Sequence, residues 1–112
     1  MAGITPFTIT LTVGVTPSVG VQCTANTGIL PSTVYWEADA ANAGVCYVGI
    51  SGMSPSSYIA RINPGQGFSL SSDAKGNVRP GSPANIQLSA LYICGANAGD
   101  IVHLTYLFRY GG

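Results

Sequence analysis

His103 is the one histidine of the chain, and Asp100 precedes it by three residues. With one of the serines, this pair could supply the base, the orienting carboxylate and the nucleophile of a hydrolytic triad. A triad also needs a local feature that presents the serine, and the sequence has no Gly-x-Ser-x-Gly elbow. Asp100 belongs to the turn sequence NAGD, and His103 falls on the polar face of the strand that follows it. We therefore predict an exposed or interface histidine and no catalytic residue.

Three cysteines, Cys23, Cys46 and Cys94, add up formally with His103 to a zinc ligand set. Structural zinc sites usually bring two ligands on one tight turn, as in Cys-x-x-Cys, whereas these cysteines are far apart and lie within strand-like segments. Three cysteines cannot all pair within one chain, and no export signal is apparent, so reduced thiols are expected. The sequence therefore predicts small buried hydrophobic residues and no metal.

The acidic residues give no better signal for a metal or for catalysis. Asp39, Asp73 and Asp100 do not belong to a dense acidic loop of the calcium-binding kind. Glu37 and Asp39 share a strand face and could be proposed as the paired carboxylates of a glycoside hydrolase. Such a pair on a strand is more often solvated or salt-bridged. We expect no catalytic residue, no cofactor and no metal ion.

Charged residues make up only 7% of the 112 residues, where an average domain has about 25%. The net charge is zero, and no basic cluster is present to bind phosphates or anionic lipids, so nucleic acids and membranes are not expected partners. Apolar residues reach 46%, but no run approaches the roughly 20 residues of a membrane span. A nearly uncharged surface promotes association, so we expect identical copies or a larger partner to cover much of it.

The hydrophobic pattern has the period of two that is typical of half-buried antiparallel strands. Segments 7–15 and 101–110 alternate most clearly, and helical stripes are absent. Short strands with frequent Gly, Pro, Asn and Ser between them indicate an all-β sandwich or barrel. One domain is expected over residues 1–112, with a possible arm at 1–6 and a mobile loop at 71–83. Six further strands are expected between the first and the last, at 19–23, 33–39, 44–50, 57–62, 67–71 and 85–94.

Residues 45–50 are apolar on both faces of the expected strand. In a two-layer sandwich one face meets the other sheet, and the second face would need cover from outside, for which a neighbouring subunit is the simplest candidate. The last strand also has a second, partly apolar face, and tyrosine is typical of interfaces. Trp36, Tyr106 and Phe108 are expected to point inward. The residues expected at interfaces are Val45, Tyr47, Tyr35, Ile101, Leu107 and Tyr110.

Four segments, in this order, resemble a module of small virion proteins of tailed bacteriophages over residues 34–108. They are an Asn-x-Gly turn leading into a Val-Tyr-Val-Gly-like strand, a Pro-Gly-x-x-Phe-Ser-Leu corner, a Leu-x-x-Leu-Tyr-Ile strand and a Gly-Asp-x-Val-x-x-x-Tyr strand. Cys46 and Cys94 depart from the pattern at usually aliphatic positions. The matching residues are Asn42, Gly44, Tyr47, Val48 and Gly49; Pro64, Gly65, Phe68, Ser69 and Leu70; Leu88, Leu91, Tyr92 and Ile93; and Gly99, Asp100, Val102 and Tyr106.

The resemblance implies a single-domain, antiparallel β-sandwich that is jelly-roll-like, with about eight short strands. It also implies a capsid decoration, or cement, protein that is made in the host cytoplasm and binds the outer surface of an assembled phage head. The expected partners are the major capsid protein and other copies of the chain, with a trimer favoured over a dimer. The alternatives are a head-fibre, tail or base-plate component, and a lectin-like sandwich that holds glycans through Trp36, tyrosines and the 71–83 loop. An enzyme that uses Asp100 and His103 is the third class of function.

Overall fold

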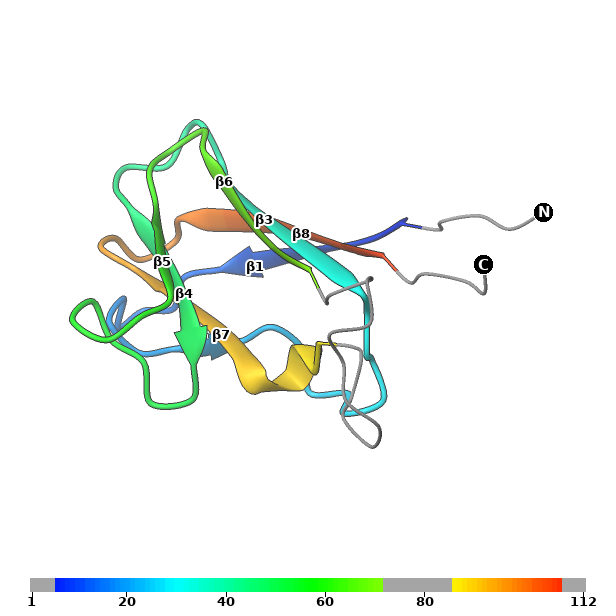
Figure 1. Ribbon diagram of the computed structural model, residues 1–112. Coiled ribbons are helices and arrows are strands. Elements are labelled where there is room, and N and C mark those ends of the chain that lie inside the picture. Colours follow the sequence, from blue (N-terminus) through cyan, green and yellow to red (C-terminus); the bar gives the residue numbers. More distant parts are fainter. Residues whose placement is uncertain (1–5, 72–85, 108–112) are drawn as a thin grey trace.

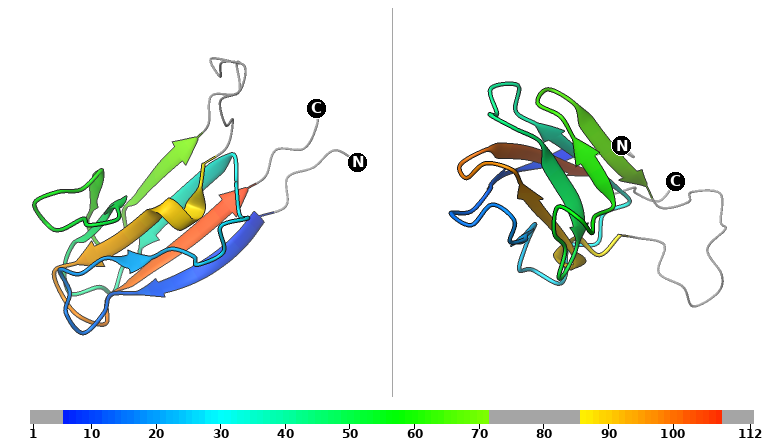
Figure 2. Two further views of the ribbon diagram at one scale, coloured as in Figure 1. Left: turned by 90° about the horizontal axis from the view of Figure 1, so that it is seen from below. Right: turned by 90° about the vertical axis from the view of Figure 1, so that its left-hand side faces the viewer.

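The computed structural model describes residues 6–71 and 86–107, which form eight strands and one short helix (Figure 1). Strands β1, β3, β6 and β8 make one layer, and β4, β5 and β7 lie in the other. The views of Figure 2 show the same two layers from two further directions. The elements are β1 (Pro6–Thr12), β2 (Val21–Gln22), β3 (Thr33–Ala38), β4 (Cys46–Ile50), β5 (Ala60–Ile62), β6 (Gly67–Ser71), the 3-10 helix η1 (Leu88–Ala90), β7 (Leu91–Gly95) and β8 (Ile101–Leu107).

The strand order is that of a jelly roll. One sheet has the order β1-β8-β3-β6, the other has the order β2-β7-β4-β5, and the neighbouring strands are antiparallel. The first strand pairs with the last, the second with the seventh, the third with the sixth and the fourth with the fifth. The chain is thus one long hairpin rolled into two sheets, which is the double Greek key of jelly rolls. The expected fold class is confirmed.

The inward faces of the two sheets meet in one core. Burial alternates along β3 and β8, so that Trp36 and its cross-strand partner Leu104 are both fully buried. Phe68 of β6 stacks on Trp36 with ring centroids 6.0 Å apart. Trp36 thus points inward, as expected, and its buried ring cannot stack on a glycan as the lectin alternative would require. The core consists of Leu11, Val13, Cys23, Val34, Trp36, Ala38, Cys46, Val48, Ile62, Leu88, Leu91, Ile93, Val102, Leu104 and Tyr106.

Three expectations about the strands need correction. Val15 was expected on the core face of the first strand, but β1 ends at Thr12 and Val15 is 97% exposed. The chain leaves the sheet there and turns back, with a hydrogen bond from the Val19 N–H to the Thr16 carbonyl. The segment 85–94 is a strand only in its second half, because η1 precedes β7. Strand β2 keeps only two of the expected residues in 19–23.

Some expectations lie outside the described residues. These are the arm at 1–6 except for the backbone of Pro6, the loop at 71–83 except for Ser71, and the side chains of Phe108 and Tyr110. In the part of the chain that is described, no helix has the length and apolar character needed to cross a bilayer.

Candidate interaction surfaces

The outer side of the sheet β1-β8-β3-β6 is polar, and we call it the hydroxyl face. Cross-strand partners point to the same side of a sheet, so the register arranges this face in rows that run across the strands. One row places Tyr35 between Thr105 and Ser69, and the next row places Glu37 between His103 and Gly67. The hydroxyl face comprises Thr8, Thr10 and Thr12; Thr33, Tyr35, Glu37 and Asp39; Gly67, Ser69 and Ser71; and Ile101, His103, Thr105 and Leu107.

The Tyr35 ring lies across the neighbouring strand at Gly67. A Cβ atom added to Gly67 would stand 2.1 Å from Tyr35 Oη and 2.5 Å from Cζ, so this position holds the ring only because it lacks a side chain. Glycine in a strand often marks such a close approach. The ring therefore rests on the sheet while 40% of the residue stays exposed.

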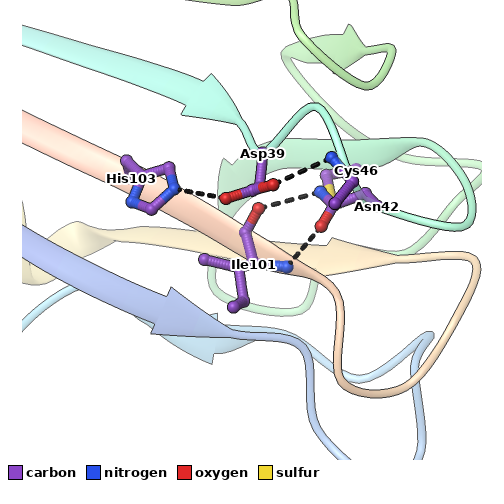
Figure 3. Close-up of polar contacts among 6 residues, drawn as sticks. Asp39, Asn42, Cys46, Ile101 and His103 are labelled. Carbon is purple, nitrogen blue, oxygen red and sulfur yellow. Dashed lines mark hydrogen bonds and ion pairs between the residues drawn. The ribbon is translucent and has the colours of Figure 1, made fainter.

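His103 is paired with Asp39 at the end of β3 (Figure 3). The ring atom Nε2 lies 2.8 Å from Asp39 Oδ2, and both side chains are partly exposed, at 40% and 34%. The hydrogen bond from His103, together with one from the Ala41 N–H, lowers the pKa of Asp39. His103 was expected to be exposed or at an interface, and its side chain is partly exposed. Of the two carboxylates expected to be solvated or salt-bridged, Asp39 is the one paired with His103. Asp100, the partner considered for a triad, is bound elsewhere.

Asp100 and Asn42 join the loop between β3 and β4 to the start of β8. The buried Asp100 carboxylate accepts hydrogen bonds of 3.0 Å from the backbone N–H groups of Ala43 and Gly44. The Asn42 side chain donates to the Ile101 carbonyl and accepts from the Ile101 N–H, each at 2.8 Å (Figure 3). These residues are therefore committed to holding the fold. The Asn-x-Gly and Gly-Asp motifs, far apart in the sequence, contact each other here.

The outer side of the sheet β2-β7-β4-β5 carries three tyrosines, and we call it the tyrosine face. It is partly covered by the chain itself, because Met53 lies over Gly49 and beside Gly20. Tyr58 packs on Tyr47 with ring centroids 4.8 Å apart. A neighbouring subunit is thus not needed to cover all of β4. The tyrosine face comprises Gln22, Tyr47, Gly49, Arg61, Tyr92 and Cys94 of the sheet, with Met53, Tyr58 and Ile59 of the β4–β5 connection.

Apolar side chains remain exposed around this face. In the β4–β5 connection they are Tyr58 at 45% and Ile59 at 48%, and in the β1–β2 connection Val19 reaches 58%. A shallow pocket of about 220 Å³ lies in the β1–β2 connection, between Val15 and Val21. Among the described residues, Arg61 is the one charged side chain on the tyrosine face. Broad, uncharged contact is the kind of interaction that such a surface favours.

The three cysteines are buried and unpaired, as expected. Burial raises the pKa of the Cys23 thiol to about 11, an effect that a contact with the Trp36 indole N–H partly offsets. Burial also raises the pKa of Cys46 to about 11, with smaller contributions from the charge of Asp100 and from Cys94. Within residues 6–71 and 86–107, no three His, Cys, Asp or Glu side chains gather in a way that could hold a metal ion.

The residues expected at interfaces do not form a single patch. Tyr35, Ile101 and Leu107 lie on the hydroxyl face, whereas Tyr47 lies on the tyrosine face and the half-buried Val45 immediately precedes β4. Tyr110 lies outside the described residues. The pattern missed the exposed apolar residues of the connections, because period two describes only the strands. Their one sequence signal was an apolar residue beside a turn, and the residues concerned are Val15, Val19, Leu30, Tyr58 and Ile59.

Comparison with models of known protein families finds no match for this chain, and comparison with curated proteins finds none either.

Proposed function

We propose that the protein is a non-enzymatic virion protein, a capsid decoration protein that binds the outer surface of an assembled phage head and stabilises it. The resemblance of residues 34–108 to phage virion modules is the first support. The jelly-roll order of the strands is consistent with it, because this fold recurs in viral capsid proteins, although it also occurs in lectins. A fold alone does not assign a function, and the exposed surfaces are what a partner would contact.

The motifs that carry the resemblance to phage virion modules include two that lie together in space, and this contact supports the resemblance. Asn42 and Gly44 belong to the first motif, and Gly99 and Asp100 to the last. Gly44 donates to Asp100, and Gly99 has a φ of +85°, a left-handed conformation that favours glycine in the turn just before Asp100. The first and the last motif are therefore in contact, although they are far apart in the sequence. The motif residues stabilise the fold of such a module, whereas its exposed residues contact its partners.

The observation that carries the proposal is the tyrosine face. Tyr58 and Ile59 are exposed there, and Arg61 is the one charged residue in the described part of the face. Apolar surface of this kind usually marks contact with another protein. We propose that the tyrosine face packs against other copies of the chain in a closed oligomer, for which a trimer is favoured over a dimer. We propose that the same face also contacts the major capsid protein. Several weak contacts per oligomer would then add up to stable attachment.

The test is light scattering of the purified protein, followed by sedimentation with empty heads and with unassembled capsid protein of the phage that encodes it. A trimer that sediments with heads only is the expected result. The double variant Tyr58→Asp/Ile59→Asp should remain folded, become monomeric and lose head binding. Thr8→Asp, an exposed position on the hydroxyl face, is the matched control and should retain both. A stable monomer that binds neither form would overturn the proposal, and binding to tails alone would move the protein to the tail.

A further inference from the structure

The hydroxyl face contains one flat aromatic surface, the ring of Tyr35. The ring rests over Gly67, and the residue is 40% exposed near the middle of the sheet. Its cross-strand neighbours are Thr105 on one side and Ser69 on the other, so short hydroxyl side chains border the ring. An aromatic ring that lies on a sheet, instead of standing between other side chains, leaves space above it for a ligand.

The next row of the same face provides hydrogen-bonding groups of a different kind. Glu37 and His103 are cross-strand partners two residues along from Tyr35 and Thr105, roughly 7 Å away at the usual rise of a strand. Asp39 holds the His103 ring in place through Nε2. Among the described residues, the Glu37 carboxylate has no hydrogen-bond partner, and the His103 side chain uses only Nε2. As far as the described residues go, the Glu37 carboxylate and His103 Nδ1 are therefore available to a ligand.

This combination matches the chemistry of a sugar ring. A pyranose has an apolar face of C–H groups, which packs well on the electron-rich face of an aromatic ring, and a rim of hydroxyl groups. A carboxylate accepts hydrogen bonds from such hydroxyls strongly, since charge-assisted bonds are the stronger ones. We propose that the hydroxyl face binds carbohydrate, with the apolar face of one pyranose ring on Tyr35 and its hydroxyl groups bonded to Glu37 and His103.

The charges of the face define the class of carbohydrate. Glu37 and Asp39 lie on it, and no lysine or arginine does in the described residues. Within the described part of the chain, an acidic sugar would meet two carboxylates and no lysine or arginine, so neutral glycans are the proposed ligands. The polar rows of this face follow one another along the strands, which suits an extended polysaccharide better than a single sugar. One open site binds weakly, but many copies on one particle would bind a polysaccharide-coated surface firmly.

The opposite face does not offer this chemistry, although it also exposes a tyrosine. Tyr58 packs against Tyr47 with the rings inclined by 48°, and its chain neighbour Ile59 is apolar and exposed. Neither a carboxylate nor a histidine of the described chain lies on that face. Tyr58, with an exposed fraction close to that of Tyr35, is therefore the matched control for the carbohydrate site.

The experiment is an NMR-monitored titration of the intact protein with neutral hexasaccharides of glucose, N-acetylglucosamine, mannose and galactose, and with an acidic hexasaccharide. At least one neutral probe should shift the amide signals of Tyr35, Glu37 and Thr105, and the acidic probe should not. Tyr35→Ala should weaken the binding at least tenfold, Tyr35→Phe by less than threefold, and Glu37→Gln severalfold. Tyr58→Ala should leave it unchanged.

Two results would overturn the carbohydrate proposal. One is the absence of shifts with every neutral probe at millimolar concentration. The other is binding that survives Tyr35→Ala or is weakened equally by Tyr58→Ala. The wild-type titration needs no variant, so a folding defect of Tyr35→Ala leaves the first result decisive. Because the site and the tyrosine face lie on opposite sheets, loss of sugar binding and loss of head binding are independent outcomes.

Discussion

The Asp100 carboxylate accepts a hydrogen bond of 3.0 Å from the backbone N–H of Gly44, a residue 56 positions earlier in the chain. A second bond of 3.0 Å comes from the N–H of Ala43. One buried side chain therefore satisfies two backbone donors of the β3–β4 loop and ties that loop to the start of β8. Asn42 completes the link through both backbone groups of Ile101.

Asp100→Ala should lower the free energy of unfolding by about 2–4 kcal/mol, because two donors lose a charged acceptor. Asp100→Asn keeps one acceptor oxygen and should cost about half as much. Urea denaturation of the three proteins measures the difference. Glu37→Gln, which removes a charge with no hydrogen bond in the described residues, is the control and should change stability by less than about 0.5 kcal/mol. Equal changes in the free energy of unfolding for Asp100→Ala and Glu37→Gln would show that the hydrogen bonds of Asp100 do not stabilise the protein.

Much of the fold could be predicted from the sequence, because the sheets impose a period of two on segments that are half buried. Trp36 and Tyr106 were expected to point inward on this basis, and they do. The ends of the strands could not be predicted so well. Val15 continues the alternation of β1 by type, but the chain turns at 16–19 and takes this side chain into solvent.

The contacts between distant segments left no pattern in the sequence. His103 is bonded to Asp39 and not to the nearby Asp100, because β3 and β8 are neighbours in the sheet. The cover of Gly49 by Met53 depends likewise on how the 51–59 connection folds back. The sequence shows Gly49 as a break in an apolar run. It does not show that the side chain of Met53 occupies the space beside this glycine.

The thiols should be almost inert in the native protein. Burial raises the pKa of Cys23 and Cys46 to about 11, and it raises that of Cys94 as well. At pH 8 only a small fraction is thiolate, the form that reacts with disulfide reagents. The expected result is little reaction in buffer and three equivalents in denaturant. A fast-reacting thiol in the native state, or zinc at about one per chain in the purified protein, would contradict this prediction.

The ion pair of Asp39 and His103 makes stability depend on pH at the acid end. The pKa of Asp39 in the folded state is lowered from the value of about 3.9 in an unfolded chain. The largest cause is the hydrogen bond from His103, and the second is the hydrogen bond from the Ala41 N–H. This contribution is therefore fully present well above the unfolded-state pKa, from about pH 6, and is lost as the pH falls through the folded-state pKa. Urea denaturation between pH 6 and pH 2 should show a steeper acid loss in the wild type than in Asp39→Asn. Parallel curves would show that the bond contributes nothing.

The last prediction concerns Met53, which the structure places over β4 where a neighbouring subunit was expected. Its Cβ, Sδ and Cε atoms all lie within about 3.2 Å of the position that a Cβ on Gly49 would occupy, and the side chain is buried. Met53→Ala should lower the free energy of unfolding by about 2–4 kcal/mol, as removal of a buried side chain usually does. Hydrogen exchange should also become faster at the Met53 N–H, which is bonded to the Ile50 carbonyl.

The control is Ile50→Ala, at a position that is 60% exposed, with an expected change of less than about 1 kcal/mol. Because the cover belongs to the same chain, the loss should be the same at every protein concentration. A loss that shrinks as the concentration rises would mean that another copy covers the strand instead.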